Sequence, residues 1–432
     1  MAANDLQSRR VVVVDGCRTP FLRSGTAFSD LMAYDLGCLA VSGLVQRARL
    51  DPAAVDLLVM GTVLADPRTT NLGREVALGA GLPLSLPAYT VTIACISSLQ
   101  SFICCLQAIQ AGQAEVAIAA GAELLSDVPI RLRRPLRKRL IAAQKVKGLP
   151  GYLGLAKGLH LSDLLPELPA IAEFSTGEVM GENCERLTKR LGISRQEQDE
   201  YALLSHQRAA AATAEGHLAR QIVPAYVPPF REPVTQDNGF RGDTTLEKLG
   251  QLKPVFDRRF GTVTAGNSSF LTDGAGAVLL MSEEAAARLG CRPLAYVRAA
   301  SAAALDPQEE LLLGPALTMP RALAAAGLEL EEVQVIELHE AFAGQVLAVL
   351  RMLDDEEFCR QRLGRERPLG AVDLARLNAW GGSLSVGHPF GATGARLIMT
   401  CCDRLQQVKG RYGLVAACAA GAQGIGLVLE AA

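Results

Sequence analysis

Residues 50–61 read Leu-Asp-Pro-Ala-Ala-Val-Asp-Leu-Leu-Val-Met-Gly, and residues 328–339 read Leu-Glu-Leu-Glu-Glu-Val-Gln-Val-Ile-Glu-Leu-His. The two stretches align without a gap, and both end in an apolar run with the character of a short buried strand. Self-similarity within one chain is the sequence mark of a repeated architecture. We therefore expect two related halves within the 432 residues.

The order of predicted elements repeats as well. Each half opens with a strand, continues through a second short strand and a Gly/Ser-containing turn into an apolar helix, and ends with two further strands. This alternation predicts a mostly parallel sheet covered by helices on both faces. We place the N-terminal half at residues 1–125 plus 259–290, an inserted loop domain at 126–258, and the C-terminal half at 291–432.

The composition is that of a globular protein with reduced thiols. The 43 Lys and Arg residues nearly balance the 45 Asp and Glu residues, which argues against a general nucleic-acid-binding surface. The 11 cysteines include no CxxC pair, so a disulfide framework is not expected. No apolar run approaches the roughly 20 residues that span a bilayer. The first strand starts so early that we expect no secretory signal, and a cytosol-like or matrix-like compartment.

Two candidate catalytic residues occupy the turns that precede the apolar helices. Cys95 lies in Val-Thr-Ile-Ala-Cys-Ile-Ser-Ser, at the expected start of a buried helix, where the helix dipole would lower the thiol pKa. His388 lies in Gly-His-Pro-Phe-Gly, a turn of unusual backbone preference. Taken alone, a cysteine in an apolar setting is more often a packing residue. The duplication makes the two turns counterparts, which would bring thiol and base together.

Two further candidates follow strands of the C-terminal half. Cys418 ends an apolar strand and opens a run of small residues whose backbone N–H groups could bind an oxyanion. His339, in His-Glu-Ala-Phe, comes directly after a predicted strand, where α/β sheets place their sites. Glu340 has a simpler explanation, because acidic residues are favoured at the start of a helix.

These four segments, their order and the duplication resemble the thiolase superfamily over nearly the whole chain. Within it the sequence is most similar to the 3-ketoacyl-CoA thiolase branch, the β subunits of trifunctional fatty-acid-oxidation complexes. Three features carry that narrower similarity: His-Glu-Ala-Phe in place of Asn-Glu-Ala-Phe, Cys418-Ala-Ala-Gly in place of Cys-x-Gly-Gly, and the long basic insertion. The resemblance implies an α/β fold with a duplicated five-layer αβαβα core and an inserted loop domain.

The resemblance also implies roles at matching positions. Cys95 would be the acylated nucleophile, His388 its activator, Cys418 the second acid/base, and His339 part of an oxyanion hole. The backbone N–H groups of Cys95 and Ala420 would form the other hole, provided that φ of Ala420 is negative. The positions matching coenzyme A or substrate contacts are Met180, Asn267, Ser269 and Phe342.

The implied reaction cleaves a 3-ketoacyl-CoA with coenzyme A into acetyl-CoA and an acyl-CoA two carbons shorter. It needs no metal and no cofactor, because coenzyme A is a substrate. Two alternatives stay open: a biosynthetic acetoacetyl-CoA thiolase, and a catalytically silent lipid-binding or scaffold subunit. A ketoacyl synthase is disfavoured by the second thiol at Cys418. Acyl chain length is not fixed by the sequence.

The insertion carries a basic, leucine-rich segment at residues 130–165. Between Arg131 and Lys157 it has nine Lys or Arg residues and no acid. Interleaved leucines and cations favour contact with an anionic membrane surface or a partner, and the competing reading is a cradle for coenzyme A phosphates. The resemblance implies a homodimer and a hydratase/dehydrogenase α subunit as partners, in a bacterial cytoplasm or the mitochondrial matrix, with possible peripheral contact at the inner membrane.

Overall fold

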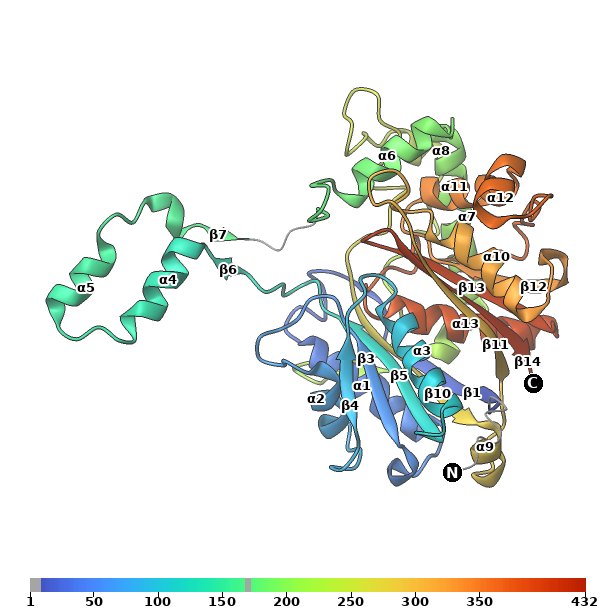
Figure 1. The fold of residues 1–432 in the computed structure, drawn as a ribbon, viewed down its shortest axis with the longest axis horizontal. Helices are drawn as coiled ribbons and strands as arrows, with labels where there is room; N and C mark the ends of the chain where they lie inside the picture. The colour runs from blue at the N-terminus through green and yellow to red at the C-terminus, as the bar shows by residue number, and fades with distance from the viewer. Residues whose placement is uncertain (1–8, 168–171) are drawn as a thin grey trace.

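The sheets of the two halves are joined edge to edge in the computed structural model, which describes residues 9–167 and 172–432 (Figure 1). The main path runs β12-β13-β14-β11-β1-β10-β5-β3-β4. The first half supplies β1 Val11–Arg18, β3 Leu57–Gly61, β4 Ala88–Val91, β5 Val116–Glu123 and β10 Thr272–Ser282. The second half supplies β11 Ala295–Ala304, β12 Val333–Leu338, β13 Tyr412–Ala419 and β14 Gln423–Ala431.

The duplication is visible in the strand order. Reading inward from each outer edge, the first half has β4-β3-β5-β10-β1 and the second has β12-β13-β14-β11. Where β4 pairs with β3, the second half keeps a single parallel bridge between Ile336 and Leu377. The two sheets meet through two antiparallel pairs, Val12 with Tyr296 and Val13 with Ala295.

The expectation of a mostly parallel sheet is wrong. Among the described strands of the main sheet, the outer pairs β3·β4, β3·β5 and β12·β13 are parallel, whereas β1·β10, β5·β10, β11·β14 and β13·β14 are antiparallel. The closing strands cause the difference. β13 and β14 are joined directly by a tight turn, a connection that forces antiparallel pairing. In the first half the insertion separates β5 from β10, and the same antiparallel pairing is kept.

Helices cover both sheets and fill the space between them. α1 (Ala33–Arg47) and α2 (Leu72–Gly79) pack on the outer face of the first half. α10 (Gly314–Ala326), α11 (Ala343–Leu353) and α12 (Glu356–Leu363) cover the second.

α3 (Ser97–Gln110) and α13 (Thr393–Val408) form the middle layer. Leu99, Phe102 and Leu106 recur at helical spacing on α3, and one apolar cluster unites them with α13 and both sheets. The layers are αβαβα, as the resemblance implied.

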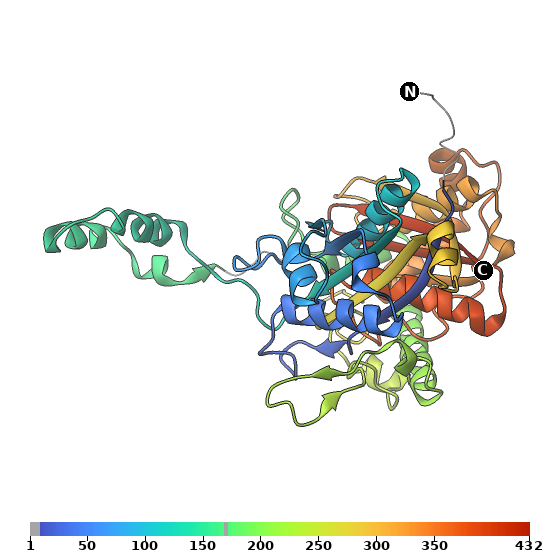
Figure 2. The same cartoon turned by 90° about the horizontal axis from the view of Figure 1, so that it is seen from below.

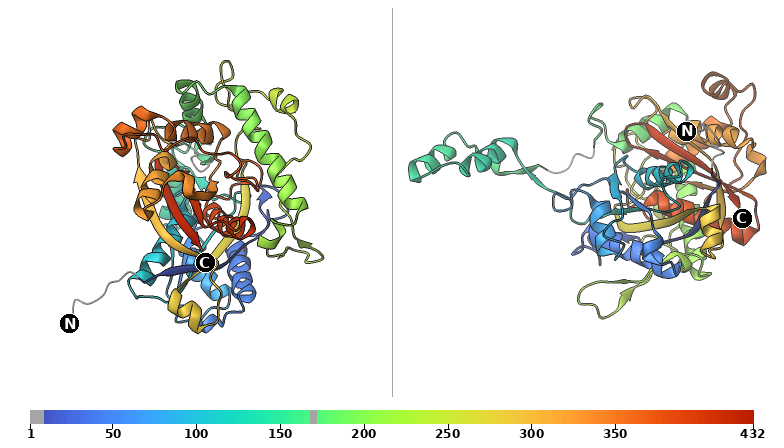
Figure 3. Two further views of the ribbon diagram at one scale, coloured as in Figure 1. Left: turned by 90° about the vertical axis from the view of Figure 1, so that its right-hand side faces the viewer. Right: turned by 60° about the horizontal axis from the view of Figure 1, so that its bottom comes forward.

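The insertion has two physically different parts. Residues 128–167, which we term the arm, carry α4 (Arg134–Ala143) and α5 (Leu149–Ala156) and project away from the sheets in Figures 1 and 2 and in the right panel of Figure 3. The later part carries α6 (Met180–Arg190), α7 (Arg195–Ala214) and α8 (Leu246–Gly250). Cys184, Leu187, Tyr201 and Leu249 share the apolar cluster of the C-terminal half. The boundaries drawn at 126 and 258 stay a prediction.

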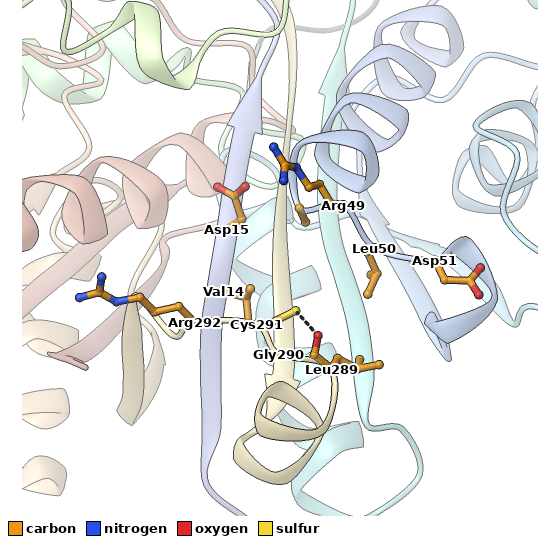
Figure 4. Close-up of a pocket in the computed structure, with 10 residues that line it drawn as sticks. Val14, Asp15, Arg49, Leu50, Asp51, Leu289, Gly290, Cys291 and Arg292 are labelled. Carbon is orange, nitrogen blue, oxygen red and sulfur yellow. Dashed lines mark hydrogen bonds between the residues drawn. The ribbon is translucent and has the colours of Figure 1, made fainter.

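A surface pocket of about 410 Å³ lies between β1, the turn after α1, and the turn after α9 (Glu283–Arg288) (Figure 4). Its walls include Asp15, Arg49, Cys291 and Arg292. None of the four candidate catalytic residues lines it. No described helix is long and apolar enough to cross a membrane.

Candidate active site

The structure brings Cys95, His339 and His388 together. One potential ligand atom of each side chain lies within 4.8 Å of those of the other two, and the imidazole centroids are 4.1 Å apart. Cys95 lies between β4 and α3, His339 directly after β12, and His388 just before α13. The meeting point is therefore the N-terminal end of the two middle-layer helices, at the carboxyl ends of the parallel strands.

The backbone around Cys95 positions the nucleophile. Ala94 has φ of +46°, in the left-handed region that alanine rarely occupies. Ser97 holds this turn closed, because its hydroxyl donates to the carbonyl of Ala94 at 2.7 Å and accepts from the N–H of Ile93 at 2.9 Å. The strained residue thus fixes where the thiol points as the chain enters α3.

The expected depression of the Cys95 pKa is wrong. Burial in apolar surroundings raises the pKa of the thiol to about 12, and the backbone N–H of Ala420, which donates to the sulfur, only partly opposes this. α3 begins at Ser97, two residues later, and burial is the dominant influence on the pKa of this thiol. At neutral pH the resting nucleophile is a thiol that must give up its proton.

The His388 turn supplies a neutral base beside that thiol. Gly387 has φ of +114°, and a Cβ added there would lie 2.7 Å from Oγ1 of Thr272. That same oxygen accepts the backbone N–H of His388 at 3.0 Å, and Oγ1 of Thr393 lies 2.6 Å from Nδ1. Burial, with the charge of Arg396, lowers the pKa of His388 to about 3. The imidazole is therefore neutral at physiological pH.

His339 is fully buried at the end of β12. Its backbone N–H donates to the carbonyl of Ala416 at 2.9 Å, and its Nδ1 lies 2.9 Å from Oγ of Ser383. Burial lowers the pKa of His339 well below its usual value, helped by the neighbouring His388 and Arg396. The Nε2 atoms of both histidines are buried without a protein partner, and are thus available to a substrate.

Cys418 and the turn after it complete the site. Cys418 lies in β13 with 1% of its surface exposed. Burial raises the pKa of its thiol, and the nearby sulfur of Cys95 raises it further. Ala420 lies outside the left-handed region, whereas Ala422 is inside it with φ of +56°. The condition set for backbone donation by Ala420 is met, and its N–H points at the Cys95 sulfur.

The candidate coenzyme A contacts gather on one side of this site. Phe342 follows His339 by three residues, and its ring meets Phe256 edge-on at a centroid distance of 6.3 Å. Phe256 in turn packs over Gly181, next to Met180 at the start of α6. The backbone N–H of Ser269 donates to the carbonyl of Ala341 at 2.9 Å. Their contact with coenzyme A remains a prediction.

Asn267 has a different position from the one expected of a ligand contact. It is fully buried, and its amide donates to Asp199 at 2.9 Å and to the carbonyl of Thr262 at 3.1 Å. Its Oδ1 accepts the N–H of Thr264 at 2.7 Å. Both amide protons are used within the protein, so its contribution is to shape the loop that carries Ser269.

Glu123 supports the site and was not identified from the sequence. Glu123, at the end of β5, accepts backbone N–H groups of Val63, Leu64 and Gly391, and so ties the His388 turn to the first half. Burial raises the pKa of Glu123 to about 7. The sequence did offer one indication of its role, because Glu123 is the acidic last residue of an otherwise apolar strand.

Glu340 is an anchor and not a helix-start residue. Its buried carboxylate accepts from the hydroxyl groups of Tyr201 and Ser205 and from the amide of Asn378, at 2.7 to 2.9 Å. Tyr201 and Ser205 belong to α7 of the insertion. This contact therefore attaches α7 to the loop of His339, and its partners lie too far along the chain for a local pattern to reveal them.

Cys95, His339 and His388 could also hold a metal ion by ligand type, because one sulfur and two imidazole nitrogens suit zinc. Whether Nε2 of each histidine offers a lone pair to a metal depends on the tautomer of each imidazole. The hydrogen bonds that each Nδ1 makes determine those tautomers.

Comparison with known proteins gives matches along nearly the whole chain. The thiolase N-terminal domain profile matches residues 11–284, and the thiolase C-terminal domain profile matches residues 291–431. The mitochondrial trifunctional enzyme subunit beta of Bos taurus is 49% identical over 423 residues, covering 98% of this chain and 88% of that protein. A 3-ketoacyl-CoA thiolase of Escherichia fergusonii is 45% identical, covering 98% of both chains. Human mitochondrial 3-ketoacyl-CoA thiolase, solved with CoA, superposes with a TM-score of 0.84 at 32% identity, covering 98% of both chains.

Proposed function

Because the chain belongs to the thiolase family, we propose that it acts as a 3-ketoacyl-CoA thiolase of fatty-acid β-oxidation. It is an acyltransferase that cleaves a 3-ketoacyl-CoA with coenzyme A. The products are acetyl-CoA and an acyl-CoA shortened by two carbons. The observation that carries this proposal is the convergence of the Cys95 thiol with the imidazoles of His339 and His388 within 4.8 Å.

In the first half-reaction Cys95 is the nucleophile. Its proton passes to Nε2 of His388 as the sulfur attacks the 3-keto carbon, and the carbonyl oxygen becomes an oxyanion. When the tetrahedral adduct collapses, the C2–C3 bond breaks and the electron pair remains on C2 as the enolate of acetyl-CoA. The Cys418 thiol gives its proton to C2, which leaves an acyl group on Cys95 and a thiolate at Cys418.

The second half-reaction reverses the proton transfers. The Cys418 thiolate takes the proton of an incoming coenzyme A thiol, whose sulfur attacks the acyl group on Cys95. Collapse releases the shortened acyl-CoA, and His388 returns its proton to Cys95. Two products leave in two steps, so ping-pong kinetics are expected.

Two sets of donors stabilise the negative charge in these steps. The backbone N–H of Ala420 already points at the Cys95 sulfur, and with the N–H of Cys95 it would bind the oxyanion of the acyl-enzyme steps. Nε2 of His339 faces the site without a protein partner and would bind the thioester enolate oxygen. Both sets are fixed before substrate arrives, which is the condition for strong electrostatic stabilisation.

The test is acylation of the nucleophile. Incubating the protein with a 3-ketoacyl-CoA without free coenzyme A, then digesting it for mass analysis, should give an acyl group on the peptide that contains Cys95. Cys95→Ala should abolish both acylation and acetyl-CoA release. Cys291→Ala, at a partly exposed cysteine of the surface pocket, is the matched control and should behave as wild type. Acylation elsewhere, or turnover without Cys95, contradicts the proposal.

The assembly proposed for this chain follows its relatives. The bovine relative is named as a subunit of a trifunctional enzyme. We propose that this chain forms a thiolase dimer and binds an α subunit with hydratase and dehydrogenase activity, in the mitochondrial matrix or a bacterial cytoplasm. Co-purification of a tagged chain with that subunit tests the assembly, and a chain that stays alone contradicts it.

The arm is the best candidate for contact with an anionic membrane. It displays large apolar side chains that are each at least half exposed: Ile130, Leu140, Ile141, Leu149, Tyr152, Leu153, Leu161, Leu164 and Leu165. Its cations lie among them, and the arm projects away from the sheets that hold the catalytic residues (Figure 2). That placement favours a surface over a coenzyme A phosphate as its partner.

Vesicle flotation tests the arm. Wild type should float with vesicles of phosphatidylcholine and phosphatidylserine. Arg131→Glu/Arg134→Glu/Lys138→Glu should lose binding, because each cation near an anionic surface contributes about 1 kcal/mol. Arg292→Glu/Arg321→Glu, at exposed positions outside the arm, is the control and should still float. Equal flotation of the arm variant and wild type would remove the membrane proposal.

A further inference from the structure

The two site histidines each contact a hydroxyl through Nδ1, but the two hydroxyls differ in their second partner. Oγ1 of Thr393, beside His388, lies 3.0 Å from the carbonyl oxygen of Pro389, which can only accept. Oγ of Ser383, beside His339, lies 2.9 Å from Nη2 of Arg396, which can only donate. The side chains of Thr393, Ser383 and Arg396 are all buried, so water does not compete for these bonds.

This difference fixes the direction of the Ser383 proton and gives the Thr393 proton an acceptor other than its histidine. Thr393 can give its proton to Pro389, and its lone pair then accepts from an Nδ1–H of His388. Ser383 already accepts from Arg396, and the hydrogen bonds of the described residues offer its proton no acceptor other than Nδ1 of His339. A buried hydroxyl proton left without an acceptor is costly, so Ser383 donates.

We infer that His339 and His388 are held in opposite tautomers, and that Ser383, oriented by Arg396, makes His339 a hydrogen-bond donor toward the substrate. His388 carries its proton on Nδ1 and presents a lone pair at Nε2 to the Cys95 thiol. His339 carries its proton on Nε2 and presents it to a developing oxyanion. Ser383 is a positioning residue, because it acts through His339.

Arg396 can play this part because it is itself anchored. It lies on α13 with 2% of its surface exposed, and its Nη1 is 3.5 Å from Oε2 of Glu337 on β12. Glu337 also accepts from Arg404 at 2.5 Å. A guanidinium has five donors and no acceptor, so the direction of the Arg396–Ser383 bond cannot invert. A chain of contacts from Glu337 through Arg396 and Ser383 therefore sets the proton on His339.

The assignment has a consequence for the Cys95, His339 and His388 cluster. A metal ion would need a lone pair on Nε2 of both histidines, but Nε2 of His339 carries a proton. Binding zinc through both Nε2 atoms would therefore require His339 to change tautomer and would leave the Ser383 proton without an acceptor, so the hydrogen-bond network disfavours a metal here. The catalytic use of the two tautomers rests on the proposed function, whereas the tautomers themselves do not.

Nitrogen NMR of histidine-labelled protein tests the inference directly. The chain has only five histidines, and His339→Gln and His388→Gln identify the two signals by their loss. In wild type, His339 should show a protonated Nε2 and His388 a protonated Nδ1. Ser383→Ala should shift His339 toward the other tautomer and lower kcat by about 10- to 100-fold, with KM for coenzyme A nearly unchanged. Ser383→Thr, which keeps the hydroxyl, should restore the tautomer and most of kcat.

Three outcomes would overturn the inference: an unprotonated Nε2 of His339 in wild type, a His339 spectrum that Ser383→Ala does not change, or equal loss of kcat in the Ala and Thr variants. The last would show that Ser383 serves packing alone. A wild-type protein with the stated tautomers but without acyl transfer would refute the proposed function and leave the tautomer assignment standing.

Discussion

The Cys95 turn and the His388 turn occupy equivalent places in the two halves, yet they are held by different means. Cys95 precedes α3 and is positioned by strained backbone at Ala94. His388 precedes α13 and is positioned by Thr393 at the start of that helix and by Thr272 and Glu123 from distant parts of the chain. The duplication supplied one turn at the start of each middle-layer helix, and the chemistry of each turn was then set by its own contacts.

Removing the nucleophile of the Cys95 turn should cause the largest loss of activity. Cys95→Ser should lower kcat by about 10⁴-fold or more, because a hydroxyl in this apolar site is a much weaker nucleophile than a thiol. Acetyl-CoA release from a 3-ketoacyl-CoA is the measurement. An unchanged melting temperature would show that the loss is chemical, and retention of more than 1% of kcat would contradict the assigned role.

Removing the base should cost less. His388→Gln is expected to lower kcat by about 10²- to 10⁴-fold, since general-base catalysis contributes that much. Mass analysis should still find any residual acyl group on Cys95. An unchanged rate of acylation would mean that another group takes the thiol proton.

The pH dependence sharpens the comparison. His388 accepts the thiol proton only when it is neutral, and its pKa of about 3 lies below the usual 6.5. In the folded state it therefore stays neutral as pH falls through 6.5, and kcat/KM should show no loss there from this residue. The unfolded chain binds the proton first, so stability should fall as pH drops from 6.5 toward 3. An acid limb of kcat/KM near pH 6.5 that His388→Gln abolishes would contradict this.

Thr393→Val should have a smaller effect that belongs to the His388 turn alone. Valine keeps the shape of threonine but removes the oxygen 2.6 Å from Nδ1, so the imidazole loses its orienting partner. We expect kcat to fall about 10- to 100-fold, as for small errors in the placement of reacting groups. Thr393→Ser is the control and should stay within about threefold of wild type.

Substitutions that alter only the backbone of the two turns should have the smallest effects on the protein, and their effects on stability should differ. Gly387→Ala forces φ of +114° on alanine and brings Cβ within 2.7 Å of Thr272, so about 2–3 kcal/mol of stability should be lost. Ala94→Gly relieves left-handed strain but frees the unfolded chain, and should change stability by less than about 0.5 kcal/mol. Urea denaturation measures both. Similar changes at the two positions would mean that the turns are held alike.

The αβαβα layers were implied by the resemblance to thiolases, and the duplication predicted that the Cys95 and His388 turns would meet, as they do. The family and the α/β layers are confirmed, whereas strand direction was wrong because it depends on where β10 and β14 return to the sheet. The pKa of Cys95 was wrong because burial is a property of the folded protein. Ser383, Arg396 and Glu123 stayed hidden because they act through contacts between segments far apart in the chain.

The middle layer has one more consequence. α3 and α13 share one apolar cluster with both sheets, so each half supplies the cover for the other's innermost helix. Expressed alone, either half would expose this apolar surface to water, and it would self-associate or stay unfolded. Co-expressing the two fragments should restore a soluble heterodimer, since the missing cover would then come from the complementary piece.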